Sequence, residues 1–226
     1  MLKVESLETW YGQTQVLWQV DIDVRAGEMI GILGRNGAGK TTLLRTVAGL
    51  QPRSRGSVTL DGSSILGADA TDIARAGLSF VREGGRMASS LTVHQHLMVG
   101  RRLAKLRGRP GRSLDDIWQT FPLLEPLQTR HAGLLSGGQR QALALAISYM
   151  SDPKVILIDE PSAGLAPKVA FELFQTLKAL ADAGTTLLVV EQQPNWLIGL
   201  AHRGYLLELG KIVKAGAIQD VIAEAA

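Results

Sequence analysis

Residues 34–41 have the types and the spacing that phosphate binding requires. They read Gly-Arg-Asn-Gly-Ala-Gly-Lys-Thr and match the pattern G-x-x-x-x-G-K-[ST] at every fixed position. Glycines in such a loop allow tight turns that aim successive backbone N–H groups at an anion. Lys40 would contact the β- and γ-phosphates, and the Thr41 hydroxyl would bind Mg²⁺. The predicted nucleotide contacts from this stretch are Gly34, Arg35, Asn36, Gly37, Ala38, Gly39, Lys40, Thr41 and Thr42.

The residues on either side of the loop fit a strand–loop–helix unit. Residues 29–33 form a short apolar run typical of a buried strand, and residues 41–49 place Leu43, Leu44 and Val47 at helical spacing. The positive end of that helix would add to the attraction for an anion. This context favours a working phosphate loop over a chance match.

Three further strands are predicted to end on polar side chains. Residues 78–81, 155–158 and 187–190 are apolar runs, and they are followed by Glu83, by Asp159-Glu160 and by Glu191-Gln192. Because ligands collect at the carboxyl ends of parallel strands, we expect these side chains beside the phosphate loop. Asp159 would bind Mg²⁺ and Glu160 would act on the attacking water. By itself, an Asp-Glu pair after a strand is also consistent with an ordinary helix cap.

The composition indicates one globular unit. The chain has 226 residues, of which 46% are hydrophobic, and this is enough for one core. A formal net charge of +3 does not identify a nucleic-acid-binding protein. The absence of cysteine excludes disulfides and thiolate chemistry and agrees with a reducing compartment. The first residues lack the apolar core of a signal peptide, and no apolar run reaches the roughly 18 residues of a membrane helix. We therefore expect any membrane association to occur through another subunit.

Positive charge is concentrated between Arg82 and Arg112, where Lys and Arg residues greatly outnumber the single acid, Glu83. Such a segment either faces acidic lipid headgroups or a partner, or it is a solvated surface. Residues 107–112 contain two glycines and a proline, and we expect them to form a flexible loop.

Periodicity and turn residues place the remaining elements. Residues 1–24 predict an antiparallel hairpin that turns at residues 11–13. Capping boxes at Thr92–Gln95 and at Ser136–Gln139 predict that helices begin there. Residues 114–121 and the segment from Pro167 predict two more helices, and residues 57–60 predict a strand. In the second strand of the hairpin, alternation places one set of residues on a common face: Val16, Trp18, Val20, Ile22 and Val24.

The alternation of strands and helices predicts an α/β fold with a mostly helical insertion. We expect a nucleotide-binding core in residues 1–83 and 153–226, with an antiparallel β subdomain at its N-terminus. The insertion, residues 84–152, would form a helical subdomain, so that residues 1–226 make a single domain.

Residues 135–139 read Leu-Ser-Gly-Gly-Gln, and with them the chain resembles the ATP-binding cassette (ABC) superfamily of P-loop nucleotide hydrolases, whose signature motif has this sequence. The resemblance covers essentially the whole chain. Its motifs occur in the family's order: Tyr11 at the adenine-stacking position, 34–41 at Walker A, Glu83 at the Q-loop, 135–139 at the signature, 155–159 with Glu160 at Walker B, 162–166 at the D-loop and Gln192 at the switch.

The resemblance implies an ATPase that binds ATP and Mg²⁺ between two subunits packed head to tail. The signature of each subunit would close on the γ-phosphate held by the other's Walker A loop. Glu160, Gln192 and Glu83 would be catalytic, and the metal would be bound by Thr41, Glu83 and Asp159. Contacts to the nucleotide would also come from Tyr11, Ser136, Gly137, Gly138 and Gln139.

Departures from the usual motifs narrow the resemblance. Glu83 stands where glutamine is usual, Gln192 replaces the switch histidine, and the D-loop carries Ala166 in place of aspartate. These features are similar to those of ATPase subunits of branched-chain amino acid and urea importers, although Arg82 and Gly85 differ from that pattern.

The implied partners are a second ATPase subunit, identical or paralogous, and integral membrane permeases, with a periplasmic solute-binding protein acting indirectly. The implied location is the cytoplasmic face of the inner membrane, peripherally bound, and no nucleic-acid partner is expected.

Two alternatives for the whole protein stay open at this stage. One is a cassette ATPase that acts on nucleic acid or ribosomes, although such relatives usually carry two cassettes or long insertions that this chain lacks. The other is a nucleotide-binding regulator without hydrolysis, which the presence of Glu160 and Lys40 disfavours. Trp10 also competes with Tyr11 for the adenine, and Tyr11 is preferred because it precedes Gly12 as in the family.

Overall fold

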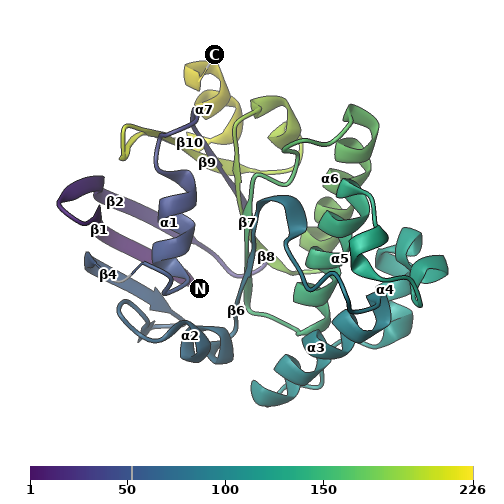
Figure 1. The fold of residues 1–226 in the computed structure, drawn as a ribbon. Helices are drawn as coiled ribbons and strands as arrows, with labels where there is room; N and C mark the ends of the chain where they lie inside the picture. The colour runs from purple at the N-terminus through teal and green to yellow at the C-terminus, as the bar shows by residue number, and fades with distance from the viewer. Residues whose placement is uncertain (52, 226) are drawn as a thin grey trace.

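The structure is a computed structural model of the chain, and it describes residues 1–51 and 53–225. Figure 1 shows a central set of strands between the N-terminal strands with α1 on one side and the helices α3 to α6 on the other. In the described part of the chain, no helix is long and apolar enough to cross a membrane.

The N-terminal sheet is antiparallel, as predicted. Its strand order is β2-β1-β4-β5. Gly12, with φ +59°, lies in the turn between the first two strands, where a left-handed conformation suits glycine. The strands are β1 (Leu2–Tyr11), β2 (Thr14–Val24), β4 (Ser54–Leu60) and β5 (Ser63–Ser64).

The core sheet has the strand order β10-β9-β3-β8-β7-β6 and is parallel except for β10. Every residue of β3, β7 and β8 is buried, which explains their continuous apolar sequences, because both faces of a parallel sheet are covered. The carboxyl ends of the parallel strands therefore meet at one edge. The strands are β3 (Met29–Leu33), β6 (Leu78–Val81), β7 (Val155–Asp159), β8 (Thr186–Glu191), β9 (Arg203–Glu208) and β10 (Lys211–Ala217).

Side chains of alternate residues in the core strands pack into two apolar clusters, one on each face of the sheet. Ile32 and Leu188 pack with α1 and the N-terminal sheet, whereas Ile158 and Val189 pack with α5 and α6. The α/β fold class predicted from the alternation of elements is confirmed. The helices are α1 (Lys40–Val47), α2 (Ala70–Ala76), α3 (Val93–Leu106), α4 (Leu114–Thr120), α5 (Gly137–Met150), α6 (Pro167–Asp182) and α7 (Ile218–Ala225). Short 3₁₀ turns occur at η1 (Glu83–Gly85), η2 (Pro122–Leu127), η3 (Ala132–Leu134) and η4 (Pro194–Leu197).

Both predicted capping boxes are present. The Thr92 hydroxyl accepts a hydrogen bond from the N–H of Gln95 at the start of α3, and the Gln95 side chain accepts one from the N–H of Thr92. Ser136 and Gln139 make the same reciprocal pair at the start of α5. These bonds satisfy N–H groups that a helix start leaves unpaired, so the two starts could be located from sequence.

The predicted alternation along β2 is wrong in its first half. Leu17 is fully buried, whereas the side chain of Trp18 is 44% exposed. A β-bulge causes the change of face, because Gln19 has φ +48° and the register against β1 shifts between Leu7 and Thr9. The extra residue places Leu17 on the buried face and Trp18 on the exposed face, and a further register shift follows between Thr9 and Trp10.

The predicted break in the helix at residues 107–112 is confirmed, because α3 ends at Leu106 and α4 begins at Leu114, but the arginines of this loop are held to the core. Arg107 donates hydrogen bonds to backbone carbonyls of three segments, and Arg109 donates to the carbonyl of Asp152. The guanidinium of Arg112 lies 4.8 Å from the ring centroid of Tyr149. Part of the basic charge between Arg82 and Arg112 therefore fixes this segment to the core, and it is not all surface charge.

Candidate functional site

The polar residues at the carboxyl edge of the core sheet meet in one cavity, as predicted. Its volume is about 750 Å³. The phosphate loop forms one wall, and Glu83, Glu160 and Gln192 form others. Asp159 is buried beneath Thr41. Asn36 and Gln192, 156 residues apart in the chain, are brought together because parallel strands deliver their carboxyl ends to the same edge.

The shape of the phosphate loop depends on its glycines. A Cβ at Gly34 would lie 2.4 Å from the carbonyl oxygen of Leu207, so any larger residue would collide with the backbone of β9. Gly39 has φ +108° and Gly37 has φ +80°, conformations that side chains disfavour. Gly37 also faces open space. Within the described residues, no side chain caps α1, so the first amides of that helix are available to an anion. This cradle fits a phosphate group.

The side chain of Lys40 is held against the phosphate loop to which it belongs. Its ammonium nitrogen donates to the carbonyl of Gly34 at 2.7 Å and to the carbonyl of Arg35 at 3.1 Å, and it lies 2.9 Å from Oε1 of Glu160. The side chain is 3% exposed. The positive charge is thus fixed between the phosphate loop and the carboxylate at the end of β7.

Thr41 and Asp159 form the candidate metal-binding pair. The Thr41 hydroxyl donates to Oδ1 of Asp159 at 3.1 Å. The pKa of Asp159 is raised to about 6: burial is the largest cause, the carboxylates of Glu160 and Glu83 also raise it, and the hydrogen bond from Thr41 and the charge of Lys40 oppose these effects. A divalent cation would relieve this cost, and oxygen ligands of these kinds suit Mg²⁺. Among the described residues, no group of three or more His, Asp or Glu side chains is arranged to hold a metal ion.

Glu160 has an unusual backbone conformation. Its φ is +42°, a strained value for a residue with a side chain, and its N–H donates to the carbonyl of Val190 at 3.0 Å. This hydrogen bond to strand β8 holds the strained conformation in place. In this conformation the carboxylate of Glu160 lies against Lys40 and lines the cavity.

The signature residues line a different cavity. Ser136, Gly138 and Gln139 face about 480 Å³ of mostly apolar space between the start of α5 and α6, and none of them is among the residues that line the phosphate-loop cavity in the described chain. Gly138 is needed for packing, because a Cβ there would lie 2.2 Å from Cγ1 of Val169 on α6. The structure therefore separates the two anion-binding motifs that the sequence predicts.

The two candidate aromatics differ in their surroundings. Trp10 is engaged by two guanidinium groups, those of Arg53 and Arg55, each 5.6 Å from its ring centroid. Tyr11 is 45% exposed at the end of β1. Its adenine-stacking role stays a prediction.

Glu191 is a residue of the site to which the sequence pattern assigned no role. It is the last residue of β8, it is 1% exposed, and it lines the phosphate-loop cavity. Its carboxylate accepts hydrogen bonds from the N–H and the hydroxyl of Ser162, each at 3.0 Å. The signal that points to it is a charged residue that completes an otherwise apolar buried strand.

Both the sequence and the fold resemble known ATP-binding transport proteins. A family model described as ABC transporter matches residues 17–163. The chain is 38% identical over 213 residues to the high-affinity branched-chain amino acid transport ATP-binding protein BraG of Pseudomonas aeruginosa, covering 94% of this chain and 91% of the relative. It is 30% identical over 223 residues to a probable branched-chain amino acid transport ATP-binding protein, LivF, of Archaeoglobus fulgidus, covering 98% and 94%. The dimeric structure of a bacterial ABC transporter cassette matches with a TM-score of 0.82 at 24% identity, covering 96% of this chain and 99% of the other.

Proposed function

The chain belongs to the ABC transporter family as an ATP-hydrolysing subunit, and we propose that the transport it powers is the uptake of branched-chain or other amino acids. Two relatives that cover more than nine-tenths of the chain are named for branched-chain amino acid transport, which supports this substrate class. The observation that carries the enzymatic part is the position of Lys40, whose ammonium lies between the phosphate-loop carbonyls and Glu160.

The geometry supports a division of work among the residues of the cavity. Lys40 and the amides at the start of α1 would bind the β- and γ-phosphates. Glu160, at the rim of the same cavity, would accept a proton from the attacking water, and Gln192 would donate an amide hydrogen bond to the γ-phosphate. Thr41, Asp159 and Glu83 would hold Mg²⁺, which neutralises developing phosphate charge when bound.

We also propose that ATP closes two copies head to tail. Because Ser136, Gly138 and Gln139 line a cavity separate from that of Lys40, one chain does not present both motifs to the same phosphate. A twofold dimer would place the signature of each copy over the phosphate loop of the other. A cassette of the same fold is known as a dimer, which supports the arrangement by analogy. Tyr11 would stack on the adenine.

The Glu160→Gln variant tests this arrangement. Glutamine keeps the shape but cannot accept the proton, so ATP with Mg²⁺ should produce a dimer that persists, measured by size-exclusion chromatography with light scattering. Glu125→Gln, an exposed acid on η2, is the matched control and should behave as the parent protein does. A Glu160→Gln protein that stays monomeric with ATP and Mg²⁺ would count against the closed dimer.

The remaining parts of the proposal concern partners and place. The cassette would dock on integral membrane permeases at the cytoplasmic face of the inner membrane. Residues 84–91, which follow Glu83, would make this contact, and residues 84–152 would move as a helical subdomain. A periplasmic solute-binding protein would act on it only through those permeases. Uptake of radiolabelled leucine by vesicles that contain the chain together with its permeases and their solute-binding protein tests the substrate class. Uptake of urea without leucine would instead favour the urea class.

A further inference from the structure

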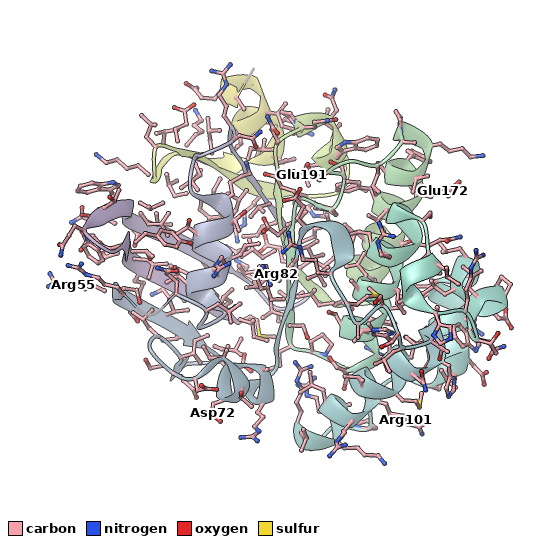
Figure 2. The ribbon with its side chains drawn as sticks, in the orientation of Figure 1. Arg55, Asp72, Arg82, Arg101, Glu172 and Glu191 are labelled. Carbon is pink, nitrogen blue, oxygen red and sulfur yellow. The ribbon has the colours of Figure 1, made fainter. Side chains whose placement is uncertain are left out.

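Glu191 joins two loops of the ATP site through one buried carboxylate. Oε1 accepts a hydrogen bond from the N–H of Ser162 at 3.0 Å. Oε2 accepts one from the Ser162 hydroxyl at 3.0 Å and one from the N–H of Gln192 at 3.1 Å. Figure 2 shows Glu191 in the middle of the molecule, between the α1 side and the α6 side. The carboxylate thus contacts the start of the 162–166 loop and the residue proposed to sense the γ-phosphate.

The backbone of Glu191 is the most firmly held part of this cluster. It ends β8, which lies between β3 and β7 in the core sheet, and it pairs with Leu33, the last residue of the strand before the phosphate loop. Ser162 and Gln192, in contrast, belong to loops that line the cavity. The sheet therefore supplies a fixed anchor, and the side chain extends it to two loops that otherwise have separate connections to the core.

We propose that Glu191 is a positioning residue that holds the Gln192 loop and the 162–166 loop in one geometry, so that the two respond together when the γ-phosphate is bound or lost. The inference rests on the proposed function, because that function assigns Gln192 to the γ-phosphate. Glu191 itself need not touch the nucleotide.

The burial of the Glu191 carboxylate indicates that its two acceptor oxygens have a role at this position that an apolar side chain could not fill. Burial raises the pKa of Glu191, and the hydrogen bonds from Ser162 and Gln192 oppose that shift. A buried ionised group is a poor way to gain stability compared with an apolar side chain of similar volume. What the carboxylate offers instead is two acceptor oxygens without a donor, which match three donors around it.

Glutamine cannot reproduce this arrangement, although it has nearly the same shape. With its amide oxygen at the Oε1 position, the NH₂ group would face the N–H of Gln192. With the oxygen at the Oε2 position, the NH₂ group would face the N–H of Ser162. In the first orientation the N–H of Gln192 loses its acceptor, and in the second the N–H of Ser162 does, although the Ser162 hydroxyl still donates to the amide oxygen. Glu191→Gln therefore removes at least one of the three hydrogen bonds that join the loops to the anchor, without opening a cavity in the core.

The test compares four proteins by steady-state ATPase kinetics and by nucleotide binding: Glu191→Gln, Ser162→Ala, the double variant and Glu208→Gln. Glu208 also ends a parallel strand of the core sheet but is exposed, so its variant is the matched control. We expect Glu191→Gln to lower kcat by about tenfold, the equivalent of one lost hydrogen bond in the reacting state, while the Kd for ATP changes by less than about threefold. The double variant should lose less than the product of the two single losses, because both changes weaken the same hydrogen-bonded cluster.

Three results would overturn the inference. The first is a kcat of Glu191→Gln within about twofold of the parent, and the second is a loss of kcat that multiplies with that of Ser162→Ala. The third is a loss of ATP binding that accounts for the lower rate, since that would make Glu191 part of the binding site. These outcomes are distinct from a failure of the proposed function, which would appear as a parent chain without ATPase activity or as a Glu160→Gln chain that does not dimerise.

Discussion

Truncation of Arg107 should weaken the junction between α3 and the core sheet. This side chain follows the last residue of α3, and its guanidinium donates five hydrogen bonds to other segments. Burial lowers its pKa to about 10, so it remains charged at neutral pH. Its acceptors are the carbonyl oxygens of Ala74, Leu78 and Ser151 and the hydroxyls of Ser79 and Ser151.

The size of the stability loss depends on which of these acceptors keep another hydrogen-bond donor when Arg107 is removed. The hydroxyls of Ser79 and Ser151 lie 3.4 Å apart, and the Ser151 hydroxyl also donates to the carbonyl of Ser148 at 2.7 Å, so their loss is partly compensated. The carbonyl of Ala74 also keeps the N–H of Gly77 at 3.2 Å, so the main loss is at the carbonyls of Leu78 and Ser151, at about 1.5–3 kcal/mol each if nothing replaces the charged donor. Because Arg107 is not fully buried, water would replace part of this. We therefore expect Arg107→Ala to lower the free energy of unfolding by about 3 kcal/mol. For a chain of this size that is a decrease in Tm of about 6–12 °C.

Urea denaturation of the nucleotide-free protein, followed by circular dichroism, measures this change. Arg102→Ala is the matched control, because Arg102 is exposed on the same helix, and it should cost less than about 0.5 kcal/mol. Arg107→Lys should be intermediate, since it keeps the charge but loses the planar fork of donors. If Arg107→Ala costs no more than Arg102→Ala, the hydrogen bonds do not contribute as argued.

Three further predictions test the site and its surroundings. At limiting Mg²⁺, the ATPase rate should fall as the pH drops through about 6, because burial raises the pKa of Asp159 to about 6 and a protonated carboxyl group is a poor metal ligand. Equal apparent Mg²⁺ affinities on both sides of that pH would contradict this, and Asp159→Asn should remove the dependence. At saturating Mg²⁺, Gln192→His should add a loss of rate between about pH 7 and 6, because histidine titrates there and glutamine does not. The same titration in both proteins would refute the switch assignment. Gly138→Ala should lower the free energy of unfolding by about 1–3 kcal/mol, because its Cβ would lie 2.2 Å from Cγ1 of Val169, and adding Val169→Ala should restore most of it. Denaturation of the single and double variants measures both effects, and additive losses would show that this contact is not the cause.

Features that depend on neighbours in the chain could be predicted from sequence. The start of α3 at Thr92 and the start of α5 at Ser136 follow from side chains that bond backbone groups three residues away. The buried strands β3, β7 and β8 follow from apolar runs bounded by turns.

The convergence of Glu83 and Glu160 on the phosphate loop was predictable for a different reason. Parallel strands place their carboxyl ends at one edge of a sheet, so the residue that follows each strand is located by topology. For the same reason the site as a set of residues was predictable, whereas the contacts within it were not.

The errors arise where a distant contact decides the conformation. The bulge at Gln19 reflects pairing with β1, and no local pattern marks a residue that turns the strand over. Arg107 in a segment with glycine and proline looks like solvated charge, because its acceptors are 28 to 44 residues away. Hydrophobic periodicity and local composition do not indicate contacts between residues that are so far apart in the chain.

The sequence by itself determined which residues are candidates for the chemistry of this protein: it predicted a phosphate loop, two carboxylates for metal and water, and a signature for a second phosphate contact, each encoded in a few adjacent residues. Only the tertiary structure decided how these parts are divided and joined. It places the signature beside α6 in a cavity separate from that of Lys40, and it gives Glu191 a partner in Ser162, 29 residues away. The physical reason is that hydrogen bonding and close packing depend on distance in space, which a one-dimensional pattern records only for residues within a helical turn or a strand pair of each other.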